Sequence, residues 1–159
     1  MRVKKGAWKS YAAWILFTEA VGAFAGALIR EGVQYFECCV NKPPLTPPGA
    51  VFPVVWGILY ALMGVSAARI YMAEESKARS GALRLYMAQL FFNFFWSIIF
   101  FMSRTYGAAF VWLTVLWVLI VRMLLAFREL EPWTARLQIP YLVWVFFAGY
   151  LNFGVWMLN

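Results

Sequence analysis

The chain contains neither histidine nor aspartate among its 159 residues. Their absence excludes a serine–histidine–aspartate triad, a histidine-ligated haem or zinc, and a proton relay built from aspartate or histidine. The two cysteines, Cys38 and Cys39, are adjacent, a spacing that is awkward for a disulfide and matches no metal-binding pattern. We therefore expect two unlinked cysteines, and we predict no metal site and no cofactor.

Charge is also scarce, since only 13% of the residues are charged while 64% are hydrophobic and 20% aromatic. Five stretches of 17 to 23 residues lack charge, except for Glu19 in the first. About 20 helical residues cross a bilayer core of about 30 Å, and the period-two alternation of a membrane barrel is absent. The sequence predicts an all-α integral membrane bundle of five transmembrane helices, forming a single domain over residues 1–159. The predicted spans are 11–29, 49–68, 85–103, 105–121 and 137–159.

The basic residues are distributed unevenly about these spans. Eleven lysines and arginines fall on the side of the N-terminus and three, Arg30, Lys42 and Arg104, on the other side. The net charge of +7 is therefore attributed to membrane orientation rather than to nucleic-acid binding. The positive-inside rule predicts a cytoplasmic N-terminus and an outside C-terminus, in the plasma membrane if the source is a bacterium with one membrane.

The first span has two interpretations. A basic start followed by apolar and small residues also describes a signal peptide. Glu19 shortens the apolar region, however, and Gly22 and Gly26 lie one turn apart, as in close helix contacts. We favour a membrane span, with these glycines as a candidate homodimer patch. For Glu19 we favour an interfacial role, with a gate as the alternative.

The connection at residues 30–48 ends in a proline-rich stretch, residues 42–49. Four prolines in six positions make this stretch stiff and exclude a helix there. It is either a lid or rim over the bundle or a spacer between the first two spans.

Three spans carry a stripe of polar and aromatic residues at helical spacing. Carboxamide and phenol groups are costly against lipid, so the stripes should face inward. Each residue alone is also explained as packing or as part of an interfacial aromatic belt. The tryptophans lie well inside their spans, which favours a pocket for a planar ligand. The stripes are Pro53, Trp56, Tyr60, Gly64 and Ala67; Gln89, Asn93, Trp96 and Phe100; and Tyr141, Trp144, Ala148 and Asn152.

At these residues the chain resembles the translocator protein family, also called TspO/MBR or tryptophan-rich sensory proteins and once known as peripheral benzodiazepine receptors. The matching order and spacing run through nearly the whole chain. The matching segments are Lys42-Pro43 with Pro47-Pro48, residues 51–64, residues 89–96, residues 140–144, Phe147-Ala148 and Leu151-Asn152.

This resemblance implies a five-helix bundle whose cavity opens toward the proline-rich loop and binds porphyrins, with sterols and isoquinoline-type drugs bound by relatives. It also implies a homodimer, and light-dependent degradation of protoporphyrin by two cavity tryptophans that match Trp56 and Trp144. The expected ligand-binding residues are Tyr35, Pro53, Trp56, Tyr60, Gln89, Asn93, Trp96, Tyr141, Trp144, Ala148 and Asn152.

Four positions depart from the family pattern. Gln34 and Leu45 replace tryptophans at the rim, and Phe153 and Met157 replace the tyrosine and the basic residue of a C-terminal sterol motif. Sterol binding through that motif is therefore not expected.

Two functions of different class fit the sequence. The first is a membrane sensor or scavenger that binds a tetrapyrrole and oxidises it in light. The alternative is a transporter that moves porphyrin, sterol or lipid without chemistry. The sequence favours the first because coupled transporters use buried charges and broken helix pairs, whereas Glu19 is the one acidic residue within these spans.

Overall fold

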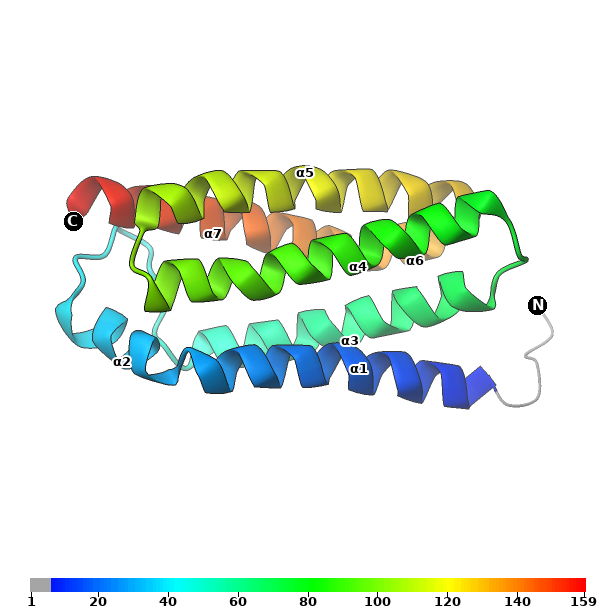
Figure 1. Cartoon of the computed structure of the whole chain (residues 1–159), viewed down its shortest axis with the longest axis horizontal. Helices are drawn as coiled ribbons and strands as arrows, with labels where there is room; N and C mark the ends of the chain where they lie inside the picture. Colours follow the sequence, from blue (N-terminus) through cyan, green and yellow to red (C-terminus); the bar gives the residue numbers. More distant parts are fainter. Residues whose placement is uncertain (1–6) are drawn as a thin grey trace.

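The computed structural model describes residues 7–159, and within this range the chain is helical without any β-strand. Residues 1–6, which include Arg2, Lys4 and Lys5 of the predicted basic N-terminus, lie outside the described residues. The five predicted spans are confirmed, and they run along the long axis of one bundle (Figure 1). They are α1 (Ala7–Leu28), α3 (Val51–Met72), α4 (Lys77–Ser97) with the π-helix η1 (Ile98–Met102), α5 (Tyr106–Leu130), and α6 (Pro132–Leu137) with α7 (Ile139–Leu158).

The helices are longer than the charge-free runs that predict them. Arg79 and Arg84 lie inside α4, and Arg122 and Arg128 lie inside α5. A charge ends an apolar run but not a helix, because a long basic side chain reaches polar surroundings while its backbone stays hydrogen-bonded. The start of α4 is fixed by Ser76, whose Oγ accepts a hydrogen bond from the Arg79 backbone N–H at 3.1 Å.

The connection at 30–48 is only partly irregular, because its first ten residues form the helix α2 (Arg30–Cys39). Val33 and Phe36 lie three residues apart on one face of α2, which allows this short helix to pack by that face. Gly32 is buried against η1, where a Cβ would lie 2.5 Å from the carbonyl oxygen of Phe101. The proline-rich stretch at 42–49 is not helical, as predicted.

The expectation of two unlinked cysteines is wrong, because the structure joins Cys38 and Cys39 in a disulfide between neighbouring residues. Their Cα atoms are 3.8 Å apart, below the usual range of about 4.4–6.8 Å on which the expectation rested. The two cysteines are the last residues of α2, beside the extended Val40.

The two ends of the bundle differ. The basic half holds the C-terminal parts of α3 and α5, the start of α4, and α6; the loop half holds α2, the proline-rich loop and the end of α7 (Figure 1). α1 packs on α3, and α5 packs between α4 and α7. Fully buried side chains fill the basic half, among them Met63, Ala67, Ile70, Tyr86, Ile120, Met123 and Phe127.

Polar contacts close the basic half. Gln138, between α6 and α7, donates from Nε2 to Ser66 Oγ at 2.8 Å and to the Leu62 carbonyl at 3.2 Å. Arg69 pairs with Glu131, and its guanidinium lies 4.7 Å from the ring centroid of Trp133. These contacts tie α6 and the start of α7 to α3.

Candidate functional site

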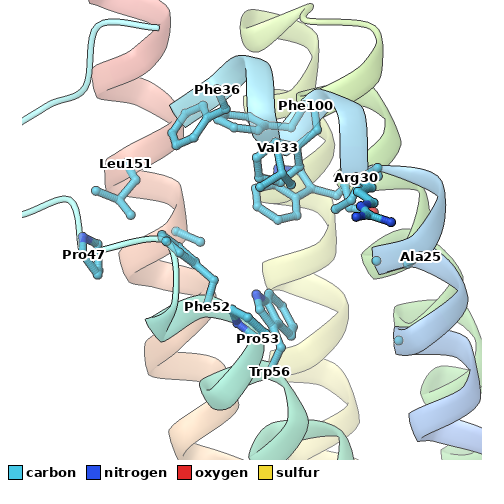
Figure 2. A pocket seen from close by; sticks show the side chains of 18 of the residues that line it. Ala25, Arg30, Val33, Phe36, Pro47, Phe52, Pro53, Trp56, Phe100 and Leu151 are labelled. Atoms are coloured by element: carbon cyan, nitrogen blue, oxygen red, sulfur yellow. The ribbon is translucent and has the colours of Figure 1, made fainter. Parts of the chain in front are cut away.

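A cavity of about 880 Å³ occupies the loop half. Its walls come from α1, α2, the proline-rich loop, α3, α4 with η1, and α7. Figure 2 shows Pro53 and Trp56 of α3 on one side of the open space, with Val33 and Phe36 of α2 across from them. Cavities that bind small molecules span about 300–1,000 Å³, so this one has room for a large ligand.

Eight of the residues predicted for the site line this cavity. They come from three separate spans, so the tertiary fold brings the three sequence stripes to one space. The eight are Pro53, Trp56, Tyr60, Asn93, Trp96, Trp144, Ala148 and Asn152.

Three predicted residues lie outside the cavity lining. Tyr35 is exposed on α2, where its ring centroid lies 3.6 Å from the guanidinium of Arg104. Gln89 and Tyr141 are fully buried behind the lining. Their direct contact with a ligand stays a prediction.

Trp56 and Trp144 belong to the aromatic part of the wall. The ring centroid of Trp56 lies 5.5 Å from that of Tyr60 and 6.2 Å from that of Tyr141. Trp144 meets Phe52 edge to face at 6.0 Å. Within residues 7–159, neither indole N–H makes a hydrogen bond, so each is available to a ligand. Indole is a donor only, and its ring offers a large flat face.

A row of hydrogen bonds, which we call the polar layer, closes the inner end of the cavity. Tyr60 Oη donates to Asn93 Oδ1 at 2.8 Å, and Asn93 Nδ2 donates to Tyr141 Oη at 3.0 Å. Tyr141 Oη in turn donates to Gln89 Oε1 at 2.8 Å. The layer joins α3, α4 and α7, and it accounts for the burial of four polar side chains in an apolar bundle.

Trp96 is held differently from the other two cavity tryptophans. Its Nε1 donates to Asn152 Oδ1 at 3.1 Å, and Asn152 Nδ2 donates to the Tyr106 carbonyl at 2.8 Å. Its ring stacks on Phe100 at 5.5 Å. Because its N–H is already used, Trp96 joins α4, α5 and α7 and offers the cavity only ring surface.

The π-helix η1 and α2 supply further lining residues. Phe100 lies on a predicted inward stripe, whereas Phe101 and the lining residues of α2 were not predicted for the site. Phe100 and Phe101 of η1 pack against Phe36 of α2 with centroids 5.6 Å apart in each case. The i, i+3 spacing of Val33 and Phe36 was a signal for an amphipathic helix here. The wide turn of η1 has no comparable sequence signal, although π-turns often occur at functional sites.

The mouth of the cavity carries charges of both signs. Arg30, Glu37 and Lys42 are among the lining residues, and Lys42 Nζ donates to the Glu37 carbonyl at 2.7 Å. The Lys42 ammonium also lies 5.3 Å from the Phe36 ring centroid. Lys42 thus fastens the proline-rich loop to α2, which covers the cavity.

On α1, the lining includes Glu19, Gly22 and Gly26. Gly22 faces the ring of Tyr60, which would overlap any Cβ at this position, whereas a Cβ at Gly26 would meet nothing within 4 Å. Gly22 therefore serves a contact within the chain. Glu19 places a carboxyl group on the lining, which favours the interpretation as a gate or ligand contact over a purely interfacial role.

The arrangement suits binding of a large flat molecule. No group of three or more histidine, cysteine, aspartate or glutamate side chains that could hold a metal ion occurs in residues 7–159. The chemistry available is that of oxidisable indole and phenol rings around an apolar space.

Comparison with known proteins agrees with this architecture. Residues 11–157 match the model of the TspO/MBR family. The chain is 37% identical to a tryptophan-rich sensory protein of Cereibacter sphaeroides over 94% of this chain and 92% of that protein. It is 33% identical to protein CrtK of Rhodobacter capsulatus (94% and 92% covered) and 34% identical to the translocator protein of Bos taurus (88% and 85% covered). This membrane protein therefore belongs to the TspO/MBR family.

Proposed function

We propose that the cavity binds porphyrins and related planar hydrophobic ligands, and that bound porphyrin is degraded in light. The observation that carries the proposal is the presence of two indoles with unused N–H groups, Trp56 of α3 and Trp144 of α7, on one cavity. The volume of about 880 Å³ and the small side chain of Ala148 leave room for a flat macrocycle.

The polar groups of the cavity would orient the ligand. Asn93 uses one N–H and its carbonyl oxygen in the polar layer, which leaves its second N–H for a polar edge of the ligand. At the mouth, Arg30 and Lys42 supply positive charge for carboxylate groups on the ligand. The macrocycle would then lie against Trp56 and Trp144, with its charged edge toward the proline-rich loop.

Photochemistry would begin with electron transfer. The photoexcited ring gains one electron from the indole of Trp56 or Trp144, so the ring is reduced and the indole is oxidised by one electron. The reduced ring passes this electron to dioxygen from the medium, which becomes superoxide. The oxidised indole then regains one electron from the macrocycle, so the net step is a one-electron oxidation of the macrocycle by dioxygen. The part of the protein is to hold an oxidisable ring in contact with the ligand, and the experiment replaces this indole by a phenyl ring that is harder to oxidise.

The test follows protoporphyrin absorbance with purified protein in the dark and under illumination. Trp56→Phe and Trp144→Phe keep most of the apolar contact, and the aromatic contribution of about 0.5–1.5 kcal/mol limits the loss of affinity to about tenfold. Light-driven loss of the porphyrin band should fall far more steeply than that. Trp156→Phe, at an exposed position outside the cavity, is the matched control and should behave as wild type.

The outcomes separate the functional classes. Equal rates of bleaching in all four proteins at saturating porphyrin would show that the cavity tryptophans are packing residues. Binding without any light-dependent loss would assign the protein to plain binding or to transport of hydrophobic cargo between leaflets. Absence of porphyrin binding would contradict the proposal as a whole.

We further propose that the N-terminus is cytoplasmic and the C-terminus outside, with the plasma membrane as host in a bacterium with one membrane. The excess of basic residues at the end of the bundle opposite α2 supports this orientation. Reporter fusions after Lys9 and after Asn159 should score on opposite faces. A cytoplasmic score for the C-terminal fusion would contradict the orientation.

A homodimer formed by this one domain is also proposed, as the family resemblance implies. Gly22 and Gly26 both line the cavity, and Gly22 is occupied by Tyr60 of the same chain, so the dimer proposal rests on the family and not on this glycine pair. Cross-linking in native membranes and the mass of the protein in detergent should both give two chains. A single chain by both methods would contradict the dimer.

A further inference from the structure

A second hollow lies on the outside of the bundle, in the basic half, between α4 and α5. It has a volume of about 490 Å³ and is lined by residues 78–88 of α4 and 122–129 of α5. It shares no lining residue with the cavity in the loop half. We call it the α4–α5 groove.

Small side chains make the groove hollow. Ala78, Gly81, Ala82 and Ala88 of α4 and Ala126 of α5 are among its lining residues. A Cβ at Gly81 would meet nothing within 4 Å, so the space in front of this residue is open. The groove is thus wide enough for a chain of methylene groups but lacks a protein side chain to fill it.

Two arginines line the groove at the same height. Arg84 lies seven residues after the start of α4 and Arg122 eight residues before the end of α5, so each is about 11 Å from its helix end. Neither forms an ion pair with another residue between 7 and 159. Glu129 is the one acidic residue of the lining, and it lies about 10 Å further out along α5.

The outer surface of α4 and α5 is apolar on the side of the two arginines that faces the middle of the spans. Both helices have the length and hydropathy of membrane spans. Phe91 of α4 and Val115 and Val118 of α5 are exposed on the mid-span surface. Basic pockets between transmembrane helices near the positively charged side are suited to lipid headgroups.

We propose that the α4–α5 groove binds one anionic phospholipid, with its phosphate between Arg84 and Arg122 and an acyl chain along the small residues and the apolar surface beyond. The guanidinium groups match phosphate geometry and charge. Free phosphate would leave the apolar part of the groove empty. A second copy of the chain related by a twofold axis would bring the arginines of both copies together, which is repulsive.

The test measures retention of phosphatidylglycerol and of phosphatidylcholine with equal acyl chains, by native mass spectrometry of the full-length protein. Wild type should retain phosphatidylglycerol preferentially. Arg84→Gln and Arg122→Gln should each reduce this preference about fivefold, since a basic residue at the membrane surface contributes about that factor. Arg128→Gln, an exposed change on the same helix as Arg122 but outside the groove, is the control and should have no effect.

Gly81→Leu tests the hollow itself, because it fills the groove without changing its charge. It should remove the retained lipid as effectively as the arginine changes, while near-ultraviolet circular dichroism shows an unchanged fold. Equal loss in Arg128→Gln would show diffuse charge attraction and overturn the proposal. The proposal would also be overturned if inorganic phosphate displaced the lipid and Gly81→Leu retained as much lipid as wild type. A third contrary result would be a change from dimer to monomer in Gly81→Leu while its lipid retention stayed unchanged.

Discussion

The basic half and the loop half of this bundle are built from the same long helices, but their side chains are packed differently. In the basic half, Met123 and Phe127 of α5 are fully buried in the hydrophobic core. In the loop half, residues of α3 and α4 instead line a cavity of about 880 Å³. The polar layer lies between the two halves.

The difference shows how one short membrane protein can be both stable and hollow. Helices in lipid gain little from apolar burial alone, so association depends on close packing and on hydrogen bonds between helices. The basic half supplies both, through its filled core and the contacts of Gln138 with α3. The loop half can then remain open, with α2 and the proline-rich loop as its cover.

The largest difference in stability is expected between two glycine-to-leucine changes, one in the basic half and one in the loop half. Gly64→Leu places a side chain against the backbone of Ile15, so α1 must move away from α3, at a cost of more than about 3 kcal/mol. Gly26→Leu projects into open space, so stability should stay near that of wild type while porphyrin affinity falls about tenfold. Unfolding in mixed micelles and porphyrin titration measure the two effects.

Equal loss of stability in the two glycine variants would contradict this division. It would mean that the loop half is as tightly packed as the basic half, and that the cavity does not exist at the stated volume in the membrane.

A smaller difference is expected for phenylalanines. Phe127→Ala removes a fully buried ring in the basic half and should cost about 3 kcal/mol. Phe52→Ala removes a ring that lines the cavity and touches Trp144, so it should cost less than about 1 kcal/mol and instead weaken porphyrin binding. The measurements are again the free energy of unfolding and the porphyrin titration. A larger loss of stability for Phe52→Ala than for Phe127→Ala would show that the loop half, and not the basic half, stabilises the fold.

The smallest effects concern the polar layer. Tyr141→Phe removes two hydrogen bonds, to Asn93 and Gln89, and should cost about 1 kcal/mol. Tyr60→Phe removes one, to Asn93, and should cost about 0.6 kcal/mol. The free energy of unfolding of each variant and of the double variant tests whether the bonds couple through Asn93. Additive losses would show that the layer is not a connected unit.

Much of the candidate site was predictable from helical spacing. Trp56 and Tyr60 lie four residues apart on one span, as do Gln89 and Asn93 on another, and such pairs face one direction on any helix. Gln89 nevertheless lies behind the lining, because its amide is satisfied by Tyr141 and the helix turns it toward the core. Spacing gives the face of a helix but not which residues of that face are covered by a neighbour.

The helix α2 and the disulfide of Cys38 and Cys39 were not predicted. A ten-residue helix is marginal on its own, and α2 is held by contacts that are distant in sequence, such as Gly32 against Phe101. The prediction that the cysteines are unlinked rested on the short Cα separation of adjacent residues. The structure accommodates a disulfide at this separation, at the end of α2.

The sequence by itself determined the five spans and the inward stripes, because hydrophobic length and helical periodicity are local properties that a bilayer makes decisive. The uneven distribution of lysine and arginine, which predicts the orientation, is likewise a property of the sequence alone. Only the tertiary structure decided that Trp56 and Trp144 share one cavity, that Trp96 is tied to Asn152, and that α4 and α5 leave a basic groove. These features depend on how helices far apart in sequence approach one another, and that approach is set by side-chain packing and interhelical hydrogen bonds.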